Sequence, residues 1–154
     1  MIGSKILLVD DEVVFTTNIS KLLTNRGYRV KAVNSGDAAI AALEEETFDV
    51  VVLDLRMPGM DGITTLREIQ KLGLFTQTLI LTGHGSIDTA LEAMKLGAYD
   101  YLAKPCEIED LVKKIEGAWE RKDDAQKKDM QEKLGRLVES PSAVFDLFPK
   151  DKKR

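Results

Sequence analysis

Three short runs of apolar residues constrain the fold of this chain most strongly. They occupy residues 6–9, 50–53 and 79–81, they consist of Val, Ile and Leu, and each is followed directly by a polar residue. Continuous rather than alternating apolarity is typical of strands that are covered on both faces, as in parallel sheets. The runs therefore predict three interior strands of a parallel sheet.

Two further segments have the pattern of strands at the edges of that sheet. Residues 28–33 alternate between apolar and polar side chains, and residues 99–102 are short and mixed. Apolar stripes at helical spacing predict five helices, marked by residues 15–23, 40–43, 63–69, 87–94 and 108–119. Ser35 is expected to cap the second of these helices. The alternation predicts an α/β, doubly wound, flavodoxin-like fold with a five-stranded parallel sheet of order 2-1-3-4-5.

The end of the chain differs from the rest in composition. Residues 120–129 contain one apolar side chain, Ala125, and a weak apolar stripe then runs over residues 130–138. This stripe predicts a C-terminal helical extension and suggests a helical contact in a homodimer. The domain boundaries expected from these patterns are a folded domain over 4–120, a helical extension over 121–139 and a flexible tail over 140–154.

Composition excludes several classes of protein. One cysteine and one histidine exclude an intrachain disulfide framework and a multi-histidine metal site. No apolar run approaches the ~18–20 residues of a membrane span, and the N-terminus lacks a signal-peptide pattern, so a cytoplasmic protein is expected. Residues 1–119 hold 12 Lys and Arg against 18 Asp and Glu. This acidic balance argues against direct binding of nucleic acid.

Three aspartates follow the predicted strands at one edge of the sheet. Ligands of open parallel sheets bind beyond the carboxyl ends of the strands, where the strand order reverses. Asp10 and Asp11 follow the first strand and Asp54 follows the third, so their carboxylates are expected to meet. At ~4 Å and an effective dielectric constant of ~20, each pair of like charges costs on the order of 4 kcal/mol. The cluster therefore needs a bound cation or a protonated acid.

Oxygen ligands of this kind favour Mg²⁺, with Mn²⁺ possible, over Zn²⁺. Thr82 ends the fourth strand and Lys104 follows the fifth, so a hydroxyl group and a cation are expected at the same edge. A hydroxyl donor, a fixed cation and a carboxylate-held metal suit a phosphoryl group. Because a carboxylate can itself accept such a group as an acyl phosphate, the site predicts phosphoryl transfer.

Four motifs resemble those of the receiver domain of bacterial two-component response regulators, and the resemblance covers residues 4–119. The motifs occur in order, at residues 8–12 (LVDDE), 52–62 (VLDLRMPGMDG), 81–85 (LTGHG) and 97–105 (GAYDYLAKP). The middle two look most like those of NtrC-type receivers. The resemblance implies a signalling domain that is switched by phosphorylation. Such a domain catalyses only its own phosphorylation from a phosphodonor and its own dephosphorylation, so it is not expected to be an enzyme in the usual sense.

The resemblance also implies a role for individual residues. Asp54 would take a phosphoryl group from the phosphohistidine of a sensor histidine kinase or a histidine phosphotransfer protein. The ligands of Mg²⁺ would be Asp11, Asp54, the backbone carbonyl of Arg56 and, partly through water, Asp10. The motifs match these positions residue by residue.

Other matching positions would bind the phosphoryl group and report its presence. Lys104 and Thr82 would contact phosphoryl oxygens, and the small Gly83 would leave a path to them. Thr82 and Tyr101 would form a switch, and the bond from Lys104 to Pro105 would be cis. The face formed by the fourth helix, the fifth strand and the fifth helix would then change and bind a downstream protein.

Two alternative functions stay open at this point. A small phosphatase could use an aspartyl-phosphate intermediate, although the haloacid-dehalogenase-like pattern wants an aspartate two residues after the nucleophile, where Arg56 stands. A receiver-like module could also act by binding alone, without phosphorylation. The sequence does not decide whether the chain stands alone or is a piece of a longer regulator, and the stand-alone form is favoured.

Overall fold

The computed structural model describes residues 3–57, 61–83 and 87–139 of the chain. Five strands are present in these residues: β1 (Lys5–Val9), β2 (Arg29–Val33), β3 (Val50–Asp54), β4 (Gln77–Thr82) and β5 (Asp100–Ala103). Five helices alternate with them: α1 (Val13–Asn25), α2 (Gly36–Glu45), α3 (Gly62–Lys71), α4 (Ile87–Lys95) and α5 (Ile108–Glu139).

The strands form one parallel sheet, which confirms the predicted fold class. Its order is β2-β1-β3-β4-β5, so β2 is added on one side of β1 and the later strands on the other, and the strand order reverses between β1 and β3. Strand β3 is buried along its whole length, and β1 and β4 are buried except at their first residues. Strands β2 and β5 lie at the edges and are partly exposed. The continuous apolar runs thus mark the interior strands, as expected for a sheet covered on both faces.

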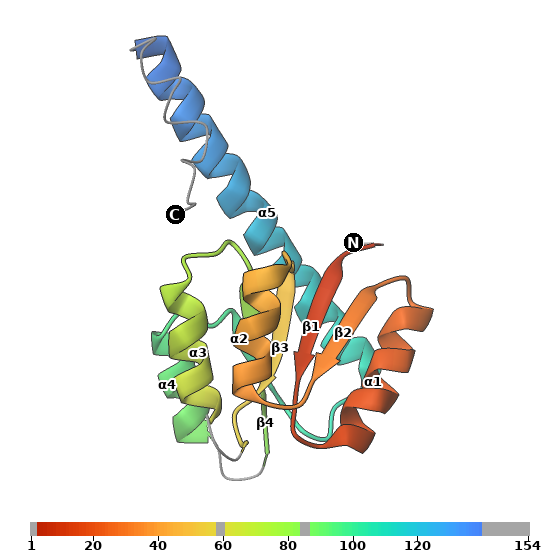
Figure 1. Cartoon of the computed structure of the whole chain (residues 1–154). Coiled ribbons are helices and arrows are strands. Elements are labelled where there is room, and N and C mark those ends of the chain that lie inside the picture. Colours follow the sequence, from red (N-terminus) through yellow and green to blue (C-terminus); the bar gives the residue numbers. More distant parts are fainter. Residues whose placement is uncertain (1–2, 58–60, 84–86, 140–154) are drawn as a thin grey trace. The chain divides into compact units, whose positions relative to one another are not determined.

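Helices cover both faces of the sheet, and the sheet separates the core into two layers (Figure 1). One layer joins alternate strand residues such as Leu7 and Leu53 to α2, α3 and α4. The other joins Ile6 and Leu8 to α1 and α5. Because successive strand side chains point to opposite faces, one apolar run supplies both layers.

Short polar side chains fix where two of the helices begin. Ser35 Oγ accepts a hydrogen bond from the main-chain N–H of Ala38, at 3.1 Å, as predicted for the cap of α2. Asp61 does the same for α3, since its Oδ1 accepts from Thr64 N–H at 2.8 Å. The Asp61 cap starts α3 directly after the loop that follows β3, close to the strand end that carries Asp54.

Replacing Gly62 with alanine is expected to destabilise the protein by about 1–3 kcal/mol, the usual cost of forcing extra atoms into a packed site. A Cβ atom at this position would lie 2.2 Å from Leu55 Cα and 2.8 Å from the carbonyl oxygen of Asp54, both main-chain atoms. The measurement is urea unfolding of the Gly62→Ala variant. The matched control is Gly135→Ala in α5, where an added Cβ meets nothing within 4 Å. Equal midpoints for the two variants would contradict this packing argument.

The chain divides into two units, Met1–Lys122 and Asp123–Arg154, and α5 begins in the first and ends in the second. The predicted C-terminal helix is therefore present, without a break at Gly135. Two ion pairs at helical spacing support its second part, Asp123 with Lys127 at 2.9 Å and Asp129 with Lys133 at 3.1 Å. The predicted flexible tail over 140–154 lies outside the described residues.

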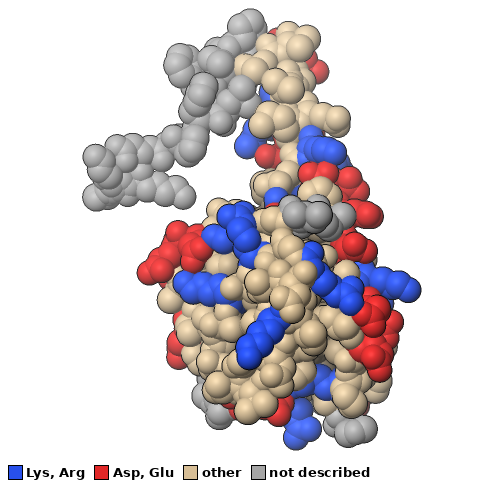
Figure 2. Space-filling view, turned by 90° about the vertical axis from the view of Figure 1, so that its right-hand side faces the viewer, with Lys and Arg blue, Asp and Glu red and all other residues tan. Residues whose placement is uncertain are grey.

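The charged side chains of the described residues are of both signs, and the helices are polar or short. On the face that Figure 2 shows, basic and acidic side chains are interspersed among the described residues of the first unit. Within the same described parts of the chain, every helix is too short or too polar to cross a membrane.

Candidate functional site

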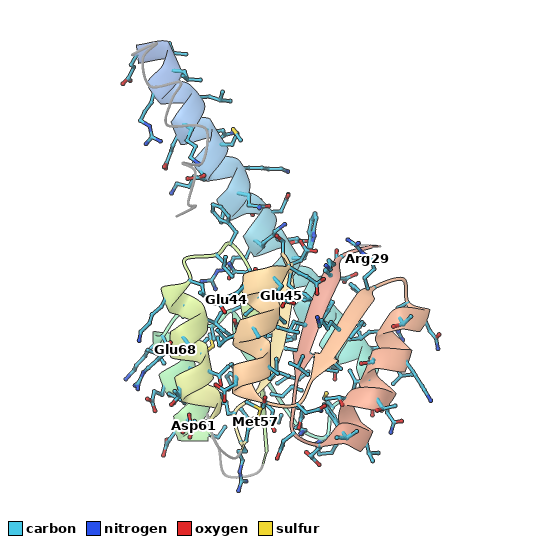
Figure 3. All side chains as sticks on the ribbon, in the orientation of Figure 1. Arg29, Glu44, Glu45, Met57, Asp61 and Glu68 are labelled. Carbon is cyan, nitrogen blue, oxygen red and sulfur yellow. The ribbon has the colours of Figure 1, made fainter. Side chains whose placement is uncertain are left out.

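The carboxyl ends of the strands meet at one edge of the sheet, and the predicted site residues gather there. Figure 3 labels Met57 and Asp61 at this edge, whereas Glu44, Glu45 and Arg29 lie away from it. A cavity of about 430 Å³ opens at the edge, lined by Glu12, Phe15, Asp54, Arg56, Gly83, Lys104 and Pro105. The cavity is thus lined by residues at or just after the ends of four of the five strands.

Two carboxylates of the site are buried. Asp10, directly after β1, is 0% exposed, and Asp54, the last residue of β3, is 4% exposed. The Oδ1 atom of Asp10 accepts a hydrogen bond from Glu12 N–H at 2.9 Å, and Oδ1 of Asp54 accepts from Arg56 N–H at 3.1 Å. These turns hold both side chains in place and leave the second oxygen of each for other partners.

Lys104 provides the positive charge between these carboxylates. Its Nζ atom lies 2.8 Å from Asp10 Oδ2, 2.7 Å from Glu12 Oε1 and 4.0 Å from Asp54 Oδ2. Burial alone would lower the pKa of Lys104, but the hydrogen bonds to Asp10 and Glu12 raise it above its usual value. The lysine is therefore a permanent cation at this edge of the sheet.

Asp54 differs from an ordinary surface aspartate in its protonation. Burial raises its pKa to about 6, the hydrogen bond from Arg56 opposes this rise, and the charge of Asp10 adds to it. Lys104 opposes it as well, but from 4.0 Å. The neighbouring positive charge of Lys104 thus does not fully offset the cost of burying the ionised carboxylate of Asp54. This property is expected of a carboxylate that also binds a further cation.

The remaining predicted residues lie at or near the same edge. Thr82 ends β4, is buried, and pairs in register with Ala103. Gly83 lines the cavity, and an added Cβ would be in ordinary contact with the side chain of Arg56 at 3.8 Å. Tyr101 is the second residue of β5, two residues before the strand ends, and it is half-buried against the core. His84, the single histidine of the sequence, lies outside the described residues.

The Lys104–Pro105 peptide bond is cis. Pro105 also lines the cavity, three residues before α5 begins. The main-chain N–H of Lys104 donates to the carbonyl oxygen of Thr82 at 2.6 Å, so the residue before the proline is fixed to the end of β4.

Three carboxylates of the site are close enough to share a metal ion. One oxygen from each of Asp10, Glu12 and Asp54 lies within 4.8 Å of the others, and oxygen-only donors of this kind suit Mg²⁺. Asp11, expected as a direct ligand, is half-buried and is not one of these three. Glu12 is the third carboxylate of this group, and the sequence had suggested no role for it.

A family model described as the response regulator receiver domain matches residues 6–116. The chain belongs to this family. The matched range includes the acidic pair after β1, the buried aspartate that ends β3, the threonine that ends β4 and the lysine after β5.

Known relatives support the same assignment. The receiver domain is 44% identical over 113 residues to the transcriptional regulatory protein ZraR of Escherichia coli (strain K12), which covers 73% of this chain and 26% of ZraR. It is 40% identical over 113 residues to the transcriptional regulatory protein FixJ of Bradyrhizobium diazoefficiens, covering 73% of this chain and 55% of FixJ. The chain therefore spans about a quarter of the first relative and about half of the second.

A solved receiver domain from Clostridium thermocellum superimposes on this one with a TM-score of 0.75 and 40% sequence identity. The match covers 78% of this chain and 97% of that chain. The fold of the receiver domain and its place among response regulators are thus established from sequence and structure together.

Proposed function

We propose that Asp54 accepts a phosphoryl group from a phosphohistidine in a Mg²⁺-dependent reaction, and that the acyl phosphate alters the contacts of the receiver with a partner. The observation that carries this proposal is the pairing of a buried Asp54 with the ammonium group of Lys104, 4.0 Å from its Oδ2, where both residues line the cavity. The family assignment supports it, because receivers are signalling domains.

The chemistry assigned to each side chain follows from its position. An oxygen of Asp54 attacks phosphorus as the bond from phosphorus to the histidine nitrogen breaks, and the electron pair of that bond returns to the imidazole. Lys104 stabilises the negative charge that spreads over the phosphoryl oxygens, and Thr82 offers its hydroxyl group as a hydrogen-bond donor. The protein supplies position and charge rather than covalent help.

The ion would be held by Asp10, Asp54 and the backbone carbonyl of Arg56, with Asp11 as a predicted ligand and Glu12 as a further carboxylate. The structure contains suitable donors, since three carboxylate oxygens lie within 4.8 Å of one another. Mg²⁺ (or Mn²⁺) would supply positive charge to the phosphoryl oxygens and offset the repulsion between the carboxylates. Asp54 then serves as nucleophile in its charged form.

The consequence of phosphorylation lies on a different part of the domain. Thr82 and Tyr101 would move together, and the face formed by α4, β5 and α5 would bind a downstream protein. Exposed apolar residues on α4, Ile87 and Leu91, belong to this face. The stripe of Met130 and Leu134 on α5 supports a homodimer as a further form of output. We place donor and receiver in the cytoplasm.

The test is uptake of phosphate from acetyl phosphate, followed by intact mass. The wild-type chain is expected to gain one phosphate with Mg²⁺ and none with EDTA, because the ion and Lys104 together neutralise the incoming charge. Asp54→Asn is expected to gain none, with Asp88→Asn, an exposed aspartate of α4, as the matched control. Uptake by Asp54→Asn at the wild-type rate would refute the proposal. Rapid turnover of phosphate esters would instead favour the phosphatase.

A further inference from the structure

An aromatic ring lies against the ammonium group of Lys104. The Nζ atom is 4.3 Å from the centroid of the Phe15 ring, and the lysine side chain is only 16% exposed. A cation within ~6 Å of an aromatic face is attracted by the quadrupole of the ring, and more strongly where water is excluded. Phe15 is therefore a further partner of this ammonium, beside the carboxylates of Asp10, Glu12 and Asp54.

Phe15 is fixed on one side and reaches the site on the other. It lies in the first turn of α1 and packs against the buried cluster formed by α1, α5 and the sheet. The same residue lines the cavity together with Asp54 and Lys104. Because the ring carries neither a titratable group nor a metal ligand, any effect on chemistry at Asp54 has to pass through a neighbour.

We propose that Phe15 is a positioning residue for Lys104, and that its ring keeps the ammonium group ordered beside Asp54 before a phosphoryl group arrives. The inference rests on the proposed function of Asp54 and deepens it. A lysine side chain has many rotamers, and ordering them costs free energy during the reaction unless the fold has ordered them beforehand. A cation that is already in place stabilises developing charge without reorganisation.

The first test compares rates of phosphorylation by acetyl phosphate at saturating Mg²⁺. Phe15→Leu keeps an apolar side chain but removes the ring, and it is expected to slow phosphorylation about three- to tenfold. Phe15→Tyr keeps the ring and is expected to retain the wild-type rate. Ile19→Val, a change in the buried face of the same helix, controls for altered packing of α1. A wild-type rate in Phe15→Leu, or an equal loss in Ile19→Val, would overturn the proposal.

The second test needs no phosphorylation. Protons above an aromatic face resonate upfield, so the ε-methylene signal of Lys104 in the ¹³C-labelled chain is expected upfield of the other lysines, with Lys104→Arg giving the assignment. Phe15→Leu should remove that shift and Phe15→Tyr should keep it. A slow Phe15→Leu variant with an unchanged Lys104 signal would show that the ring acts by packing, against the proposal. Failure of the wild-type chain to take up phosphate would refute the proposed function instead, while the shift would still report the contact.

Discussion

Asp54→Asn is expected to raise the free energy of unfolding by on the order of 2 kcal/mol at neutral pH. Burial raises the pKa of Asp54 from 3.8 to about 6, so the folded protein binds this proton more tightly than the unfolded chain does. The contribution of Asp54 to the stability of the wild-type protein therefore falls as the pH rises from about 4 to about 6, and it then stays constant. Asparagine has no charge to bury and keeps the acceptor for Arg56 N–H.

The measurement is urea unfolding in EDTA between pH 4 and pH 8. The difference between Asp54→Asn and the wild type should be near zero at the acid end and complete above the pKa of Asp54. Asp88→Asn, at an exposed position in α4, is the control and should change stability by less than about 0.5 kcal/mol. If Asp54→Asn is less stable than the wild type at pH 8, the ionised carboxylate of Asp54 does not destabilise the folded protein, and the prediction is wrong.

Lys104→Gln is expected to cost about 3 kcal/mol of stability in EDTA, the usual result of removing one partner from a buried ion pair. Asp10 is fully buried and pairs with Lys104 at 2.8 Å, so the substitution leaves its charge uncompensated beside Glu12 and Asp54. The proposed metal ligands stay in place in this variant. Mg²⁺ is therefore expected to raise the free energy of unfolding of Lys104→Gln more than that of the wild type.

The measurement is thermal and urea unfolding with and without Mg²⁺. Lys114→Gln removes a lysine that pairs with Asp100 at a partly exposed position, and it should cost less than about 1 kcal/mol. Equal losses for the two lysine variants would show that Lys104 contributes only as a surface charge.

Sequence reasoning predicted the fold because its strongest pattern has one physical cause. Strands such as β3 are apolar throughout since helices cover both faces, and the edge strand β2 alternates since it is partly exposed. Whether α5 continues past Trp119 could not be read from the apolar pattern. The run 120–129 has almost no apolar face, and ion pairs such as Asp123 with Lys127 support the helix there instead.

The placement of two site aspartates could be predicted from the sequence, whereas the arrangement of the loop after β1 could not. Strand ends place Asp10 and Asp54 at the sheet edge by topology alone, so both follow from the sequence. Which of the next acidic residues faces Asp54 depends on backbone angles. Glu12 has an extended conformation, with φ −81° and ψ 97°, and its N–H donates to Asp10, which turns its side chain toward Lys104. The contact of Phe15 with Lys104 likewise joins residues far apart in the sequence and follows from no local pattern.

The most direct test of the central claim is the location of the phosphate on the chain. After treatment with acetyl phosphate and Mg²⁺, hydroxylamine converts an acyl phosphate to a hydroxamate and releases phosphate. Peptide mass spectrometry then identifies the modified carboxyl group. We predict a single hydroxamate, at Asp54, that is absent in EDTA and absent in Lys104→Gln or strongly reduced there. A hydroxamate on Asp10, Asp11 or Glu12, or a phosphate that resists hydroxylamine, would contradict the assignment of Asp54 as the acceptor.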